Sequence, residues 1–131
     1  WHVLEHVENL KSTIETLKRL LKPGGRIIVA VPNYKSYDAT FYEEHWAGYD
    51  VPRHLWHFSQ KAIHKLFSEV EMVVDKILPM KFDSYYVSLL SEKNKSGKSN
   101  PINAFYRGFL SNRKARSTTE YSSLIYVLKN D

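Results

Sequence analysis

The stretch from residue 7 to residue 32 constrains the fold more than any other part of the sequence. Apolar residues recur at helical spacing over Val7–Lys22, with charged residues on the opposite face. A Pro-Gly-Gly sequence then predicts the end of the helix, because proline cannot continue it and glycine permits a tight reversal. Arg26–Val31 follows, and its apolar run is typical of a strand covered on both faces of an α/β sheet.

The rest of the chain predicts further strands and helices. Ser59 is a good N-cap and Phe58 is placed to pack on Ile63, so a helix is expected to follow them. Strands are expected at Glu71–Leu78 and Tyr121–Lys129. The predicted order over the whole chain is helix, strand, helix, strand, two helices, strand.

Two regions between these elements are less regular. Tyr34–His57 is rich in aromatic residues and is expected to lack regular structure. After the second strand, Asp83 is expected to cap a short helix, residues 94–101 to form a mobile polar loop, and Ile102–Arg116 to form another helix.

Composition excludes several classes of protein. There is no cysteine, which excludes a disulfide scaffold and fits the reducing cytoplasm, where we expect the protein to reside. The longest aliphatic run, residues 27–31, is far shorter than the roughly 20 residues that span a bilayer. The net charge of +5 permits an anionic partner without requiring one.

Three motifs follow one another along the sequence: VLEHV at residues 3–7, LLKPGG at residues 20–25, and PRHL with HFS between residues 52 and 59. In this order they resemble the class I S-adenosylmethionine-dependent methyltransferases, in their broad small-molecule group of types 11, 12 and 23. The resemblance implies a Rossmann-like α/β sheet whose fifth, sixth and antiparallel seventh strands are the three predicted here. Residues 79–120 would then be a helical insertion before the last strand.

The family binds its cofactor with a glycine-rich turn after the first strand, and this sequence contains no such turn. Its glycines stand at 24, 25, 48, 97 and 108, and no two form Gly-x-Gly. We therefore expect residues 1–131 to be the C-terminal half of a methyltransferase domain, with the N-terminal cofactor-binding half absent. Alone, it would be inactive, and Arg26–Val31 would be an unpaired edge through which two copies can form a homodimer.

The opening residues His2, Glu5 and His6 match the H-x-x-E-H spacing of one group of zinc peptidases. The helix, turn and strand that follow do not resemble those enzymes, so we expect no metal. The resemblance instead places all three residues at the cofactor, S-adenosylmethionine, beyond the carboxyl end of a strand. The remaining alternative is that they only cap the next helix.

A second group surrounds the PRHL motif. His54 and His57 are interpreted as catalytic, because histidine is suited to accept a proton from the methyl acceptor. The aromatic residues around them would exclude water and tolerate a cationic sulfonium. The residues interpreted as binding the substrate are Asn33, Trp46, Tyr49, Asp50 and Arg53. The alternative is that the two histidines are structural and bond to the backbone at the helix entry.

The expected function is methyl transfer from S-adenosylmethionine to a small molecule or a glycan or lipid precursor, with this chain supplying the acceptor side and part of the cofactor pocket. The alternative is a nucleic-acid-binding module, because basic residues interleave with aromatic ones in the last helix. Its cations are Arg107, Arg113, Lys114 and Arg116. Such charges more often form a solvated helix face, so nucleic acid is not the expected partner.

Overall fold

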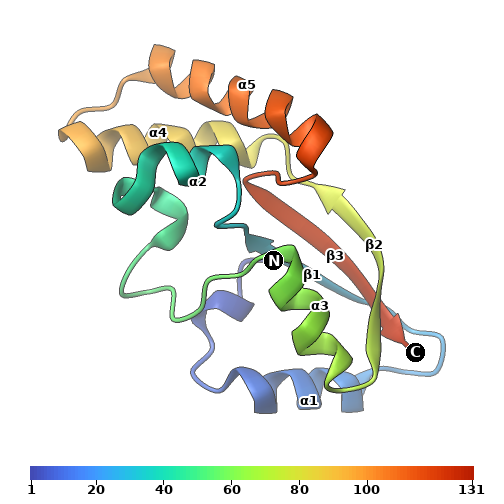
Figure 1. Cartoon of the computed structure of the whole chain (residues 1–131). Coiled ribbons are helices and arrows are strands. Elements are labelled where there is room, and N and C mark those ends of the chain that lie inside the picture. The colour runs from blue at the N-terminus through green and yellow to red at the C-terminus, as the bar shows by residue number, and fades with distance from the viewer.

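The computed structural model describes all 131 residues and shows a mixed α/β fold (Figure 1). In chain order its main elements are α1 (Leu10–Leu20), β1 (Ile27–Pro32), α2 (Tyr37–Tyr42), α3 (Gln60–Ser68), β2 (Met72–Pro79), α4 (Asp83–Ser96), α5 (Pro101–Thr118) and β3 (Ser123–Asn130). Single 3-10 turns lie at Leu4–His6, Glu43–His45 and Ala47–Tyr49. None of the helices combines the length and apolar composition needed to cross a bilayer.

The three strands form one sheet in the order β1-β3-β2, with β3 antiparallel to both neighbours. The expectation that the last strand runs opposite to the first is therefore confirmed. In the register, Ile125 of β3 lies between Ala30 of β1 and Leu78 of β2. The equivalence of these strands to the fifth, sixth and seventh strands of a complete methyltransferase sheet stays a prediction.

Helices α1 and α3 cover one face of the sheet and form the main core with it (Figure 1). Asn9 caps α1 by accepting a hydrogen bond from Ser12 N, which is why the helix begins later than its apolar spacing predicts. Ser59 caps α3 as expected, and Phe58 and Ile63 are both buried in the same cluster. The core members are Leu4, Leu10, Ile14, Val29, Val31, Phe58, Ile63, Phe67, Met72, Leu124, Tyr126 and Leu128.

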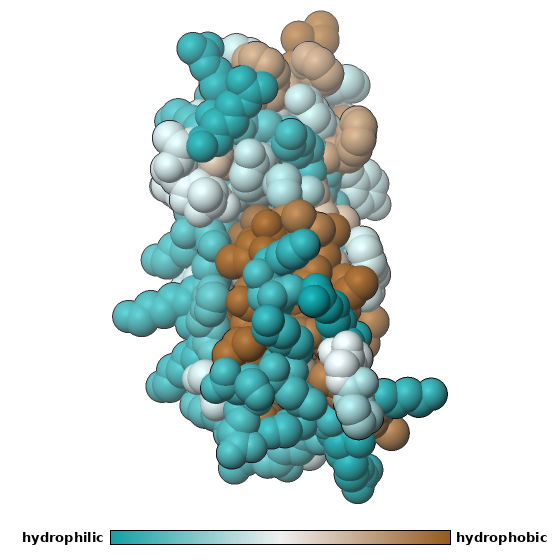
Figure 2. All heavy atoms as spheres, turned by 90° about the vertical axis from the view of Figure 1, so that its right-hand side faces the viewer, coloured by the Kyte–Doolittle hydropathy of each residue, from teal (hydrophilic) through white to brown (hydrophobic).

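The other face of the sheet is only partly covered, and this corrects the expectation for β1. Ala30 is buried, but Ile28 is 53% exposed. Viewed from the side of β2, apolar side chains gather in a patch that hydrophilic ones partly overlie (Figure 2). The outer edge of β1 accepts a hydrogen bond of 2.9 Å from His2 N to Ala30 O. Dimerisation through this edge stays a prediction.

Helices α2, α4 and α5 form a second layer beyond one end of the sheet (Figure 1). The stretch predicted to be irregular contains α2, which Ser36 caps by accepting from Ala39 N. Asp83 is the first residue of α4 and not its cap, so that prediction is wrong. Helix α4 also extends to Ser96, where Gly97 ends it in the left-handed conformation, and only a short turn separates it from α5.

A buried carboxylate joins this helical layer to the sheet. Asp38 of α2 has no exposed surface and accepts hydrogen bonds from Trp46 Nε1, Ser111 Oγ and Ser122 Oγ at 2.7, 2.6 and 2.7 Å. These donors belong to the loop after α2, to α5 and to the residue preceding β3. Asp38 therefore fixes the loop that begins at Trp46 against the rest of the molecule.

Candidate active site

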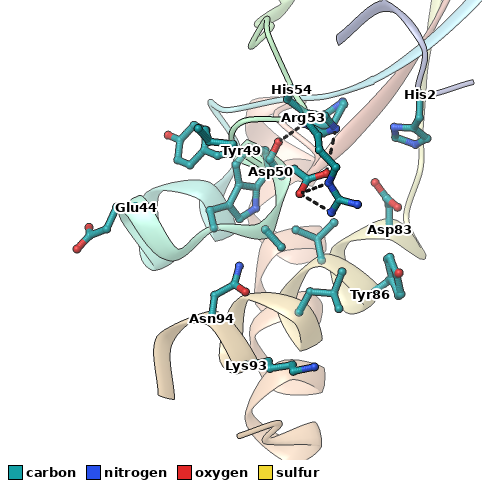
Figure 3. Close-up of a pocket in the computed structure, with 17 residues that line it drawn as sticks. His2, Glu44, Tyr49, Asp50, Arg53, His54, Asp83, Tyr86, Lys93 and Asn94 are labelled. Carbon is teal, nitrogen blue, oxygen red and sulfur yellow. Dashed lines mark hydrogen bonds and ion pairs between the residues drawn. The ribbon is translucent and has the colours of Figure 1, made fainter. Parts of the chain in front are cut away.

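A cavity of about 630 Å³ lies where the loop from Trp46 to His54 faces α4 and the first residues of the chain. Several of its polar side chains point into one space, whereas those of Glu44 and Tyr49 point away from it (Figure 3). The polar residues that line it are His2, Glu44, Tyr49, Asp50, Arg53, His54, Asp83, Tyr86, Lys93 and Asn94. The volume is in the range of small-molecule sites, and the lining carries both signs of charge.

The shape of this loop depends on Gly48 and Asp50. A Cβ atom at Gly48 would stand 2.4 Å from the buried ring of Trp46, so only glycine fits there. Asp50 adopts the left-handed conformation, which asparagine and aspartate tolerate best among residues with side chains. Arg53 then reaches back, and its Nε and Nη2 donate to Asp50 Oδ1 at 3.1 and 2.6 Å. The pair is exposed and contributes less than about 1 kcal/mol, but it orients the Asp50 carboxylate.

His54 is half-buried and faces the cavity through one nitrogen. Its Nδ1 lies 2.9 Å from Gly48 O, and because a carbonyl only accepts, Nδ1 is the nitrogen that carries the proton. Its Nε2 lies 3.8 Å from Asp50 Oδ2. In the neutral ring Nε2 therefore keeps its lone pair, which is the form that accepts a proton or binds a metal.

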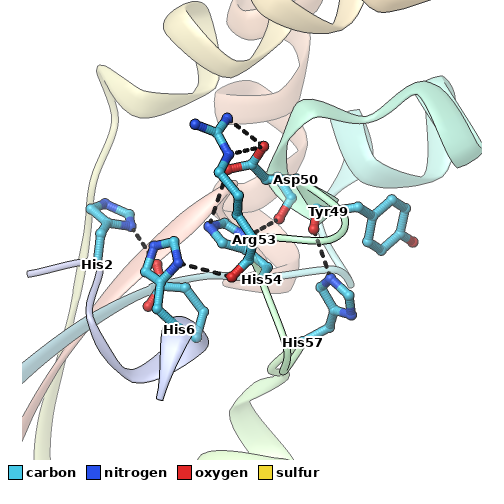
Figure 4. Close-up of polar contacts among 9 residues, drawn as sticks. His2, His6, Tyr49, Asp50, Arg53, His54 and His57 are labelled. Carbon is cyan, nitrogen blue, oxygen red and sulfur yellow. Dashed lines mark hydrogen bonds and ion pairs between the residues drawn. The ribbon is translucent and has the colours of Figure 1, made fainter. Parts of the chain in front are cut away.

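His6 and His57 also bond to backbone carbonyls. His6 Nδ1 lies 3.0 Å from Arg53 O, and its ring meets that of His54 edge to face at 4.7 Å (Figure 4). His57 Nε2 lies 2.9 Å from Tyr49 O, and the ring is outside the cavity. The structural interpretation thus accounts for the contacts of His57, whereas His54 combines a backbone bond with a position in the cavity.

Glu5 is the most deeply buried member of the opening motif. His2 Nδ1 donates to its Oε1 at 3.1 Å, while Oε2 is buried without a hydrogen-bond partner. Burial alone would raise the pKa of Glu5, but the hydrogen bonds from His2 and from the backbone hold it below its ordinary value. The same bond to Glu5 does most to raise the pKa of His2, against the effect of burial.

The H-x-x-E-H spacing does not place the two histidines one turn apart on a helix. Leu4–His6 is a single 3-10 turn, and His2 lies before it with a φ of 47°. Instead, one ligand atom from each of Glu5, His6 and His54 lies within 4.8 Å of the others, so these three residues can hold a metal ion.

The remaining predicted residues divide into two groups. Trp46, Tyr49, Asp50 and Arg53 all line the cavity. Asn33 does not: it is buried, its Nδ2 donates to Glu120 Oε2 at 2.7 Å, and its Oδ1 accepts from Lys35 N. It therefore holds the end of β1 against the segment before β3.

Sequence reasoning missed the contribution of α4, which brings Asp83, Tyr86 and Lys93 to the cavity. The rule that ligands bind beyond the carboxyl ends of strands applies to β2 as well as β1, and it points to Asp83. On α5, two of the cations of the nucleic-acid alternative are engaged within the fold. Arg107 lies 3.8 Å from the ring centre of Phe41, and Lys114 lies 3.9 Å from that of Tyr37.

Comparison with protein families gives a match. The family model described as "Methyltransferase domain" matches residues 1–76, which is more than half of the chain. This range contains the opening motif, β1, the cavity loop and α3. No curated protein matches the chain.

Proposed function

Because the chain belongs to the class I S-adenosylmethionine-dependent methyltransferases, we propose that it takes part in methyl transfer from S-adenosylmethionine to an acceptor bound in the cavity. The observation that carries the proposal is an overlap. His2 and the loop from Trp46 to His54 lie within the matched residues and line the same cavity. Residues 1–131 supply the acceptor side and part of the cofactor pocket in this proposal, and act poorly alone.

The proposed roles follow the positions of the residues. His2, Glu5 and His6 form the cofactor side, because they lie together beside the edge of β1. The acceptor side is formed by Trp46, Tyr49, Asp50 and Arg53. Asn33 supports this side indirectly, because its hydrogen bond to Glu120 holds the end of β1 in place. Methyl transfer needs the acceptor atom held in line with the sulfonium and shielded from water, which an aromatic-lined cavity favours.

His54 is the catalytic histidine of this proposal. An acceptor that carries a proton must lose it as the methyl group arrives, and His54 presents Nε2 to the cavity beside Asp50. His57 acts as a positioning residue, because its bond to Tyr49 O holds the cavity loop.

The acceptor has a polar reacting end in this proposal. Arg53 and Lys93 supply positive charge around the cavity, and Asp50 and Asp83 supply negative charge. A small molecule or a glycan or lipid precursor with hydroxyl or amino groups suits such a lining.

Isothermal titration of S-adenosylmethionine into the full natural protein that carries these residues tests the proposal. We expect saturable binding that His2→Ala weakens at least tenfold, with His64→Ala on the exposed side of α3 as the matched control. Binding of neither S-adenosylmethionine nor S-adenosylhomocysteine would overturn it. The same titration into residues 1–131 alone is expected to give much weaker binding.

A further inference from the structure

Two histidines near the cavity are arranged as metal ligands usually are. The Nδ1 atoms of His6 and His54 both point at backbone carbonyls, those of Arg53 and Gly48. Metal-binding histidines typically use one nitrogen in this way, which fixes the ring and leaves the other nitrogen as a donor to the ion. Here the nitrogen left over is Nε2 in both rings (Figure 4).

Glu5 provides a separate observation. Its side chain is 1% exposed and its Oε2 has no hydrogen-bond partner, although Oε1 is held by His2. A buried carboxylate oxygen without a partner is costly, and such atoms in a folded protein need an explanation. A cation bound between Glu5, His6 and His54 would supply the missing partner.

We propose that Glu5, His6 and His54 bind a divalent first-row transition metal ion, with Zn²⁺ the best fit. One carboxylate and two imidazoles form a donor set that suits zinc in catalytic sites, where the remaining position stays open. Magnesium is disfavoured, because it prefers oxygen ligands and water. Of the three residues, His54 lines the cavity, and its Nε2 lies 3.8 Å from Asp50 Oδ2.

Binding requires a small closure of the three residues. Their ligand atoms lie within 4.8 Å of one another, whereas ligand atoms around a tetrahedral zinc stand roughly 3.4 Å apart. His6 is exposed and lies on a single 3-10 turn, so its side chain has the freedom to move towards the other two.

In the proposed function His54 acts on the acceptor's proton. With the ion bound it would do so through the metal and not as a direct base, so this part of the inference rests on that function. An acceptor hydroxyl that fills the open position is acidified and releases its proton to water. The oxygen then forms a bond to the methyl carbon as the bond from carbon to sulfur breaks, and the sulfonium becomes the neutral thioether of S-adenosylhomocysteine. Glu5 and His6 would then contribute to the reaction through the ion as well as forming the cofactor side of the site.

Titration of Co²⁺ into the metal-stripped full protein tests the binding directly, because four- or five-coordinate Co²⁺ has visible absorption bands. We expect one equivalent to bind and Zn²⁺ to displace it. Glu5→Gln, His6→Ala and His54→Ala should each weaken binding at least 100-fold, while His64→Ala should leave it unchanged. The exposed position of His6 keeps the test valid should the other two variants unfold.

Equal Co²⁺ binding by His6→Ala, or no saturable binding by the unaltered protein, would overturn the inference. The outcome is separable from that of the proposed function, because S-adenosylmethionine binding is measured on the same metal-stripped sample. Cofactor binding without Co²⁺ binding leaves the methyltransferase proposal standing and removes the metal site. The reverse result removes the methyltransferase proposal and leaves the metal site.

Discussion

Trp46 Nε1 donates a 2.7 Å hydrogen bond to Oδ2 of Asp38, a carboxylate with no exposed surface. Ser122 donates to the same oxygen and Ser111 to the other. Asp38→Ala leaves these three donors buried without an acceptor, so we expect the free energy of unfolding to fall by about 3 kcal/mol. Urea denaturation followed by tryptophan fluorescence measures the change. Trp46→Phe removes one donor together with its hydrogen bond, so it should lower the free energy of unfolding by less than Asp38→Ala does. A decrease as large as that of Asp38→Ala, or larger, would contradict this account.

Gly108 on α5 is packed against α4 so closely that alanine should not fit. A Cβ atom there would stand 2.7 Å from Tyr85 Cδ1 and 2.9 Å from Tyr85 Cα. Alanine favours a helix interior by about 1 kcal/mol over glycine, but forcing the helices apart costs about 1–3 kcal/mol. We expect Gly108→Ala to lower the midpoint of urea unfolding, whereas Ser117→Ala on the exposed side of α5 should barely change it. A rise in the midpoint would show that the two helices separate at no cost.

Asp75 of β2 forms ion pairs with Arg26, the residue that precedes β1, at 2.7 Å and with Lys129 of β3 at 3.0 Å. The hydrogen bond from Lys129 does most to hold the pKa of Asp75 below its ordinary value; desolvation opposes it and the charge of Arg26 adds to it. A lowered folded-state pKa means that the stabilisation is complete above the unfolded-state pKa of about 3.9 and is lost as pH falls through the folded-state value.

Asp75→Asn should therefore lower stability at pH 6 and make the loss of stability on acidification shallower. Urea midpoints measured from pH 6 down to about pH 3 report both effects. Asp131→Asn is the matched control, because Asp131 forms no ion pair. Parallel midpoint curves for the Asp75→Asn variant and the unaltered protein would contradict the prediction.

The two histidines interpreted as catalytic should differ in their effect on turnover. His54 faces the cavity, whereas His57 contacts Tyr49 O outside it. In the full protein we expect His54→Ala to reduce methyl transfer by about 100-fold or more, as loss of a group that acts on the acceptor's proton does. His57→Ala should cost much less and act mainly on the KM of the acceptor. Release of S-adenosylhomocysteine measures both; equal losses in kcat would refute the distinction.

Much of the fold could be predicted because its signals are local. The Pro-Gly-Gly turn, the Ser59 cap and the apolar run of β1 each depend on neighbouring residues. Helix α2 was missed because it is short and lies in an aromatic stretch, where Ser36 was the one capping signal. The exposure of Ile28 could not be predicted either, because it depends on what packs on the second face of the sheet.

The candidate site was only partly predictable, for a related reason. The motif around Arg53 and His54 was found from local sequence, and both residues line the cavity. The position of His54 beside Glu5 and His6 depends on a contact across almost fifty residues, which spacing does not encode. Asn33 carried no signal that separated a binding role from its bond to Glu120.

The central strand of the sheet is the one that comes last along the chain. During synthesis, β1 and β2 have no common partner until residues 123–130 leave the ribosome, so the edges that will face β3 remain open until then. Joining of β1 to β2 is thus a late and cooperative event, and a nascent chain halted after α5 would have formed all the helices of these residues before the strand that links β1 and β2 was made.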